Sequence, residues 1–124
     1  MKADPRLRGK WGEEVATGFL VDKGYITVAK GFRSRFGEID IISKNKEYLT
    51  FTEVKTRKNK TFAHAKEFVS KEKQRKIIKT ASYYLLKHPT KLQPRFDVIE
   101  IYAKDGEHTI SPEIIHIENA FELN

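Results

Sequence analysis

The 124-residue chain has the size of one domain, and we expect a single domain over residues 1–124. Hydrophobic residues make up 39% of the chain and aromatic residues 11%, which excludes a disordered tail. The absence of cysteine excludes disulfides and thiolate metal sites. The sequence shows neither a membrane-spanning apolar run nor a signal-peptide core, so we expect a cytoplasmic protein without a membrane partner.

The net charge of +7, from 24 Lys and Arg against 17 Asp and Glu, is concentrated in one tract. Between Lys55 and Lys79 there are ten basic and two acidic residues. A localised basic surface attracts polyanions such as nucleic acid, although a solvated lysine-rich helix explains the tract equally well. The candidate nucleic-acid-binding residues in the tract are Arg57, Lys58, Lys60, Lys71, Arg75 and Lys76.

A first helix is predicted from Pro5 to about Gly24, because Asp4 before Pro5 is a favourable N-cap and glycine is a favourable stop. Glu13 lies just past the margin of the apolar face of this helix, so it would be near the edge of the surface that the helix covers. An ordinary surface glutamate is an equal alternative. The apolar face itself is marked by residues that recur every fourth position, namely Leu7, Trp11, Val15 and Phe19.

Three strands are predicted next, because β-branched and aromatic residues cluster between short polar connections. Short connections favour an antiparallel meander. The predicted strands are 25–32, 37–42 and 48–57, with a turn at 33–37 and a loop at 44–47.

Charged residues interrupt the second and third of these strands. Alternation of side chains places Glu53 and Lys55 on the face of Phe51, and Asp40 on the face of Ile42. Charges are almost never fully buried unless they are paired or bind a metal. These positions therefore mark the candidate functional site.

The second half of the chain predicts a basic loop over residues 56–67 and a helix capped by Ser70 and ending near His88. Gln74 projects from the apolar side of this helix with Lys73 at its edge. Such an amide usually forms its hydrogen bonds within the core, but this one is also long enough to reach the carboxylates. Further strands are predicted at 95–102 and 109–117, with a turn at 105–106 and an edge position indicated by Pro112.

Asp40 and Glu53 on adjacent strands would crowd two carboxylates, which raises one pKa unless a cation binds between them. Mg²⁺, or Mn²⁺ in its place, prefers such oxygen ligands. Lys55 beside Glu53 would orient or deprotonate an attacking water and stabilise charge that develops on a phosphate. Two carboxylates, a divalent cation and a lysine are the groups that phosphodiester hydrolysis requires.

An acidic residue in the first helix, followed by Asp40 and by Glu53-Val54-Lys55 on successive strands, resembles the PD-(D/E)xK nuclease superfamily. A larger ordered set more closely resembles the uncharacterised bacterial YraN-type family, whose members are usually compared with archaeal Holliday-junction resolvases. The resemblance covers about Gly9 to Ile101. The motifs that carry it are Gly12-Glu13, Gly37-Glu38-Ile39-Asp40, Glu53-Val54-Lys55-Thr56-Arg57, Lys73-Gln74 and Arg95-Phe96-Asp97-Val98.

The resemblance implies an α/β fold with a restriction-endonuclease-like α-β-β-β-α-β core: a central mixed sheet flanked by helices. To this core we add a predicted C-terminal strand. The resemblance also implies that Asp40 and Glu53 are metal ligands, that Lys55 is the catalytic lysine and that Glu13 is an additional acidic ligand. Gln74, together with Lys73, would support the site from the second helix.

The primary expectation is a magnesium-dependent endonuclease acting on DNA, with branched or structured DNA as the narrower expectation. RNA is the alternative substrate, and a homodimer is left open as the assembly. One rival is a non-catalytic nucleic-acid-binding module that retains the fold. Another treats Glu53 and Lys55 as a structural ion pair, which leaves Asp40 without a partner.

Overall fold

The computed structural model describes residues 5–58 and 69–122. The predicted cap Asp4 and most of the predicted loop, including Lys60, lie outside these residues. Within them, the short strands and two amphipathic helices follow the predicted order. The elements are α1 (Pro5–Asp22), β1 (Ile26–Ser34), β2 (Gly37–Lys44), β3 (Tyr48–Arg57), α2 (Lys71–Lys87), β4 (Gln93–Tyr102), the short 3₁₀ helix η2 (Gly106–His108) and β5 (Glu113–Phe121).

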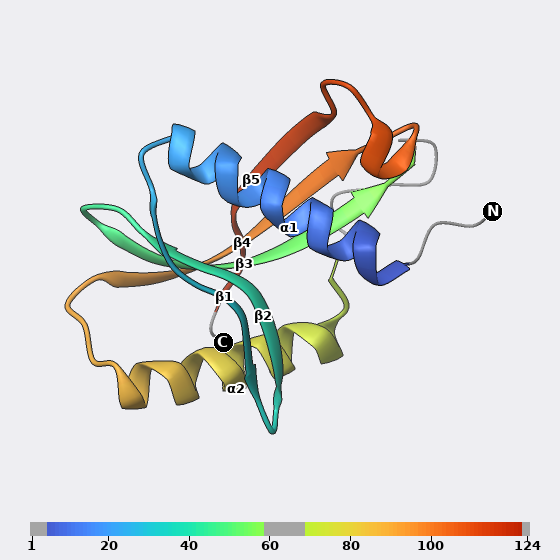
Figure 1. Ribbon diagram of the computed structural model, residues 1–124. Coiled ribbons are helices and arrows are strands. Elements are labelled where there is room, and N and C mark those ends of the chain that lie inside the picture. Colours follow the sequence, from blue (N-terminus) through green and yellow to red (C-terminus); the bar gives the residue numbers. More distant parts are fainter. Residues whose placement is uncertain (1–4, 59–68, 123–124) are drawn as a thin grey trace.

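The strands form one mixed sheet in the order β1-β2-β3-β4-β5. The β3–β4 pair is parallel and is connected through α2, whereas the other neighbouring pairs are antiparallel. Helix α1 covers one face of the sheet and α2 covers the other (Figure 1). The predicted meander, the α-β-β-β-α-β core and the added C-terminal strand are confirmed.

Each helix buries its apolar stripe against the sheet, so the molecule has a core on both sides. Burial of aliphatic and aromatic side chains of this size stabilises the fold by about 1.5–3 kcal/mol per side chain. Ala16 and Leu20 of α1 pack on Ile41, Ile99 and Ile101, whereas Ile77 and Tyr84 of α2 pack on Ile39, Ile42, Phe51 and Phe96.

The helix ends follow local chemistry. Gly24 adopts a φ of +99° after α1, and the Tyr25 N–H donates to the Leu20 carbonyl at 3.0 Å, which closes the helix with a Schellman-type bond. Ser70 caps α2 by accepting a hydrogen bond from the Lys73 N–H at 3.1 Å. Both boundaries are confirmed.

The last strand begins later than predicted, at Glu113 instead of residue 109. Residues Gly106–His108 form a 3₁₀ turn instead of a tight hairpin, and Ser111 has a left-handed φ of 55° directly before Pro112. The residues up to Pro112 therefore cannot form the backbone hydrogen bonds that would pair them with β4. Beyond that point β5 is the edge strand that Pro112 indicated. In the described part of the chain, no helix combines the length and apolarity that a membrane crossing needs.

Candidate active site

Asp40 lies where β2 separates from β3. The paired residues of these strands run only from Ile41 opposite Thr52 to Lys44 opposite Leu49. Beyond these paired residues the contact between the strands is made by the Asp40 side chain, whose Oδ2 accepts a hydrogen bond from the Val54 N–H at 2.8 Å. The carboxylate thus replaces a strand carbonyl at the point where the two strands fork.

The fork also interrupts the side-chain alternation that the sequence predicted around Asp40. Ile39 and Ile42 both pack in the α2 core, whereas Ile41 packs in the α1 core. The β1–β2 hairpin bends toward α2, where the Ser34 hydroxyl lies 3.1 Å from that of Thr80 (Figure 1). This bend opens β3 beyond its last paired residue.

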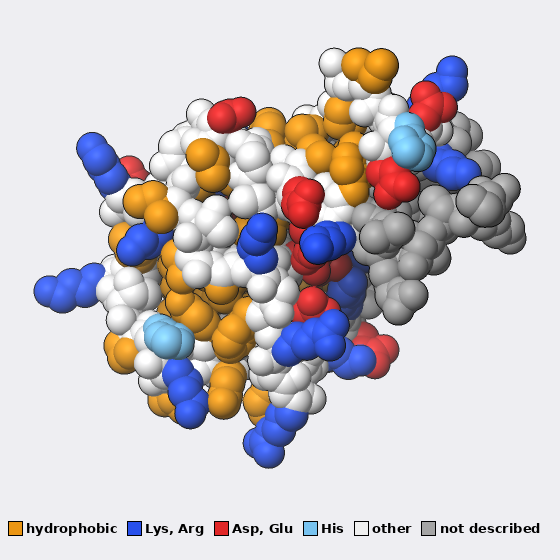
Figure 2. All heavy atoms as spheres, in the orientation of Figure 1, with side chains coloured by type: hydrophobic (Ala, Val, Ile, Leu, Met, Phe, Trp, Pro, Cys, Tyr) orange, Lys and Arg blue, Asp and Glu red, His pale blue; other side chains and the backbone are white. Residues whose placement is uncertain are grey.

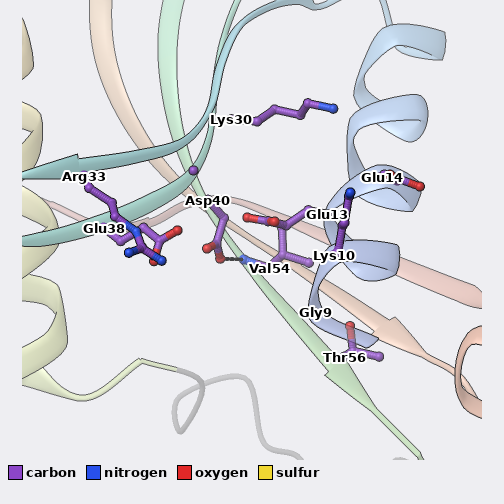
Figure 3. Close-up of a pocket in the computed structure, with 11 residues that line it drawn as sticks. Gly9, Lys10, Glu13, Glu14, Lys30, Arg33, Glu38, Asp40, Val54 and Thr56 are labelled. Carbon is purple, nitrogen blue, oxygen red and sulfur yellow. Dashed lines mark hydrogen bonds and ion pairs between the residues drawn. The ribbon is translucent and has the colours of Figure 1, made fainter. Parts of the chain in front are cut away.

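Glu13 reaches the same place from α1 because the helix approaches β3 closely. A Cβ atom on Gly12 would lie 2.4 Å from the Thr56 hydroxyl, so glycine permits the approach. Figure 3 shows Glu13 projecting from α1 toward Asp40. Glu13, Glu38 and Asp40 each place one carboxylate oxygen within 4.8 Å of the others.

The crowding of these carboxylates changes their protonation. Burial raises the pKa of Asp40 to about 7, with a further upward contribution from the charge of Glu53, although the Val54 N–H opposes the shift. Burial and the charge of Glu38 raise the pKa of Glu13. A group of oxygen donors that repel one another in this way fits a divalent cation such as Mg²⁺ or Mn²⁺.

Glu53 lies on β3 with only 6% of its surface exposed, and it is neutralised by two lysines. Its Oε1 lies 2.5 Å from the Lys73 Nζ and 3.5 Å from the Lys55 Nζ. Burial and the nearby Lys73 lower the pKa of Lys55, against the attraction of Glu53. Burial alone would lower the pKa of Lys73, but the ion pair with Glu53 outweighs it and raises that pKa.

Two cavities meet at the carboxylates. One has a volume of about 660 Å³ and lies between α1 and the β1–β2 hairpin; the other has about 400 Å³ and lies between β2, β3 and α2. Asp40 and Glu38 line both. The first is also lined by Lys10, Glu13, Lys30 and Arg33, and the second by Glu53, Lys73 and Lys76.

The structure thus brings together Glu13, Asp40, Glu53, Lys55 and Lys73 from the predicted set. It does not bring Gln74 to them. The Gln74 amide donates to the Val69 carbonyl at 2.9 Å, and the residue lines a separate cavity together with Lys71 and Arg75.

The predicted basic residues are dispersed over several places. Lys76 lines the cavity beside α2, and Arg57 lies 3.9 Å from the buried Glu100. Lys58 is exposed beside η2, where it lines another cavity with Lys104.

Sequence reasoning missed four residues around the carboxylates. Glu38 carries a signal, since it lies two positions before Asp40 in the same predicted strand. Lys10, Lys30 and Arg33 carry none, because isolated basic residues are common on helices and edge strands. Only their place around the larger cavity distinguishes them.

The family model described as "Uncharacterised protein family UPF0102" matches residues 12–101, which span Glu13, Asp40, Glu53, Lys55 and Lys73. The chain belongs to this family. A UPF0102 protein of Clostridioides difficile is 44% identical over 115 residues, covering 92% of this chain and 96% of the relative. UPF0102 proteins of Persephonella marina and Caldanaerobacter subterraneus are each 40% identical, over 119 and 121 residues, covering 95% and 97% of this chain and 96% and 98% of the relatives. The predicted YraN-type family is thereby confirmed.

Proposed function

We propose that this protein is a divalent-metal-dependent endonuclease that hydrolyses phosphodiester bonds in DNA. The observation that supports this most strongly is the crowded, partly buried group of Glu13, Glu38 and Asp40, which interacts with Glu53, the partner of a lysine whose pKa is lowered. Repulsion among these carboxylates destabilises the fold, and a bound cation would relieve that repulsion.

In this proposal Asp40, Glu13 and Glu38 hold Mg²⁺ or Mn²⁺, with Glu53 contributing from β3. When bound, the cation would lower the pKa of a water molecule and neutralise charge on the phosphate. Asp40 is positioned for this role by the Val54 N–H, which fixes its carboxylate at the fork. Glu13 is positioned by the close contact of α1 with β3.

Lys55 acts on the proton of the attacking water and on the charge of the phosphate. Its lowered pKa leaves its Nζ unprotonated, and so free to accept a proton near neutral pH, for a larger fraction of the time than in an ordinary lysine. Lys73 contacts the same Glu53 oxygen as Lys55 and keeps the charge of that carboxylate compensated. Both lysines therefore act within one ion-pair group centred on Glu53.

Basic side chains near the site support a polyanionic substrate. Figure 2 shows acidic side chains gathered on one face of the molecule with Lys and Arg side chains beside them. Lys73 and Lys76 line the cavity on the α2 side of Asp40. Positive charge around an acidic centre attracts phosphates while leaving the carboxylates for a cation.

The decisive experiment incubates purified protein with labelled linear, flapped and four-way-junction DNA, with and without Mg²⁺ or Mn²⁺. We expect metal-dependent cleavage that Glu53→Gln and Lys55→Ala each reduce by at least about 100-fold, because groups of this type contribute a few kcal/mol to the barrier. Lys44→Ala, an exposed change at the far end of β2, is the control. Binding without cleavage would instead indicate a non-catalytic nucleic-acid-binding module, and full activity of Lys55→Ala would refute the proposed roles. RNA of the same sequence tests the choice of substrate.

Metal binding can be tested without a substrate. A cation that binds only the folded state stabilises it by about 2.7 kcal/mol at a hundredfold excess over Kd. The wild type should therefore melt at a higher temperature with millimolar Mn²⁺ than with chelator, and Asp40→Asn should lose most of that increment. A wild-type melting temperature that ignores Mn²⁺ would contradict the metal site.

A further inference from the structure

The carboxylates lie between two cavities and do not close off either of them. Asp40 and Glu38 line both the cavity beneath α1 and the cavity beside α2. A phosphate placed at Asp40 therefore has space on two sides. An active site that receives only the end of a strand would be expected to be closed on one of them.

Each side of the carboxylates carries its own basic residues. Lys73 and Lys76 on α2 line one cavity, within the basic tract that the sequence marked. On the other side Lys10 of α1 and Lys30 and Arg33 of β1 line the larger cavity, from outside that tract (Figure 3).

The three residues of this second group are available to a ligand. Lys10, Lys30 and Arg33 are all exposed, and the Arg33 side chain is 79% exposed. Arg33 lies 3.6 Å from Glu38, an exposed ion pair of the kind that contributes little to stability. Lys30 attracts the charge of Glu13, but it too is exposed, so these contacts leave the three basic side chains accessible to a ligand.

We propose that Lys10, Lys30 and Arg33 bind backbone phosphates of a nucleic-acid strand on the α1 side of the carboxylates, so that the strand crosses the site and continues in both directions. This inference rests on the proposed function and deepens it. The substrate is then an internal position of a polynucleotide, and no strand end is needed for binding.

The charges around the larger cavity make this contact dependent on a cation. Its lining carries three basic side chains and four acidic ones, Glu13, Glu14, Glu38 and Asp40. With all four carboxylates ionised, a bound divalent cation changes the sum of these charges from net negative to net positive. Phosphate binding by Lys10, Lys30 and Arg33 and metal binding by the carboxylates should therefore strengthen each other, and this coupling is reciprocal.

The test measures the affinity for a fluorescent single-stranded DNA as a function of salt, in Mn²⁺, with the Lys55→Ala background to prevent cleavage and a gel to verify intact DNA. Adding Lys30→Ala and Arg33→Ala should lower the slope of log K against log salt by about 1.4, because each lost phosphate contact on a single strand removes about 0.7. The control adds Lys44→Ala and Lys91→Ala, which remove the same charge from exposed positions outside both cavities. A circular single strand should bind as tightly as a linear one of equal length.

The outcomes separate this inference from the function on which it rests. Absence of DNA binding by the Lys55→Ala background would refute the proposed function. Two results would overturn the second contact surface alone. In the first, the Lys30 and Arg33 substitutions leave the salt slope of binding unchanged; in the second, the Lys44 and Lys91 control lowers that slope equally. Binding of the linear strand without the circle would show that the site needs an end, and would overturn both this inference and the assignment as an endonuclease.

Discussion

Two aspartates within the same sheet, Asp40 and Asp97, have opposite electrostatic environments. Asp97 on β4 is fully buried and accepts bidentate hydrogen bonds from Arg95 at 2.9 and 2.8 Å. It also accepts from His116 at 2.8 Å and from the Asn119 N–H at 3.0 Å. Burial by itself raises the pKa of Asp97, but these donors outweigh it and lower the pKa.

Asp40 accepts a hydrogen bond from one backbone donor and is crowded by Glu13 and Glu53, so its pKa is raised to about 7, first by burial and then by Glu53. The difference shows that the partners of a buried carboxylate, and not burial alone, decide whether its pKa is raised or lowered. Helix α1 spans both regions. Glu13 lies in the carboxylate group, whereas the Phe19 ring meets the His116 ring edge-on at 6.0 Å.

The largest expected effect comes from neutralising each aspartate in turn. Asp97→Asn removes the nearer counter-charge of the buried Arg95 guanidinium and leaves Glu118, at 3.9 Å, so it should lower the free energy of unfolding by about 3–5 kcal/mol. Asp40→Asn removes repulsion and should leave that free energy unchanged or raise it in the presence of chelator. Urea denaturation of both variants measures the contrast. Equal destabilisation by the two substitutions would contradict the distinction between the regions.

The pH dependence of stability should also distinguish the two aspartates. The unfolded Asp40 loses its proton near pH 3.8, whereas the folded protein keeps it until about pH 7. Stability linked to Asp40 therefore falls as pH rises from about 4 to 7, by at most about 1.4 kcal/mol per pH unit. Asp97 has a lowered pKa, so its contribution is present above the unfolded value and is lost only at more acidic pH.

The measurement is the free energy of unfolding of the wild type and Asp40→Asn in chelator across pH 4 to 7. The variant should gain on the wild type as pH rises through this window. A constant difference between the two proteins would show that Asp40 does not hold its proton in the folded state.

The smallest expected effect concerns how α1 approaches the two regions. Gly12→Ala places a methyl group against Thr56 and overpacks the contact by about 1–3 kcal/mol, offset by about 1 kcal/mol of helix propensity. Gly18→Ala meets nothing within 4 Å and should stabilise the fold by about 1 kcal/mol. Gly12→Ala should therefore leave the melting temperature unchanged or lower it, whereas Gly18→Ala should raise it. Adding Thr56→Ala to Gly12→Ala should restore stability, and failure of this rescue would contradict the contact.

Local chemistry in the sequence determined most of the fold. Apolar residues at helical spacing, the Ser70 cap, the Gly24 stop and the β-branched runs act over a few neighbouring positions, so they can be recognised without a structure. The same logic identified Asp40, Glu53 and Lys55, because charges within apolar strands are conspicuous wherever the strands lie. The start of β5 was missed because the 3₁₀ turn and left-handed Ser111 before it have weak sequence signals.

Only the tertiary structure decided which partners those charges meet. The fork of β2 and β3 brought Glu38 into the carboxylate group, and the rotation of α2 about its axis placed Lys73 on Glu53 while turning Gln74 to the Val69 carbonyl. The same long-range packing gave Asp97 its donors from β5 and surrounded Asp40 with acids. Electrostatic energies fall steeply with distance, so a bend of one strand or a small rotation of one helix decides whether a charge is paired or crowded, and neither is encoded within a few neighbouring residues.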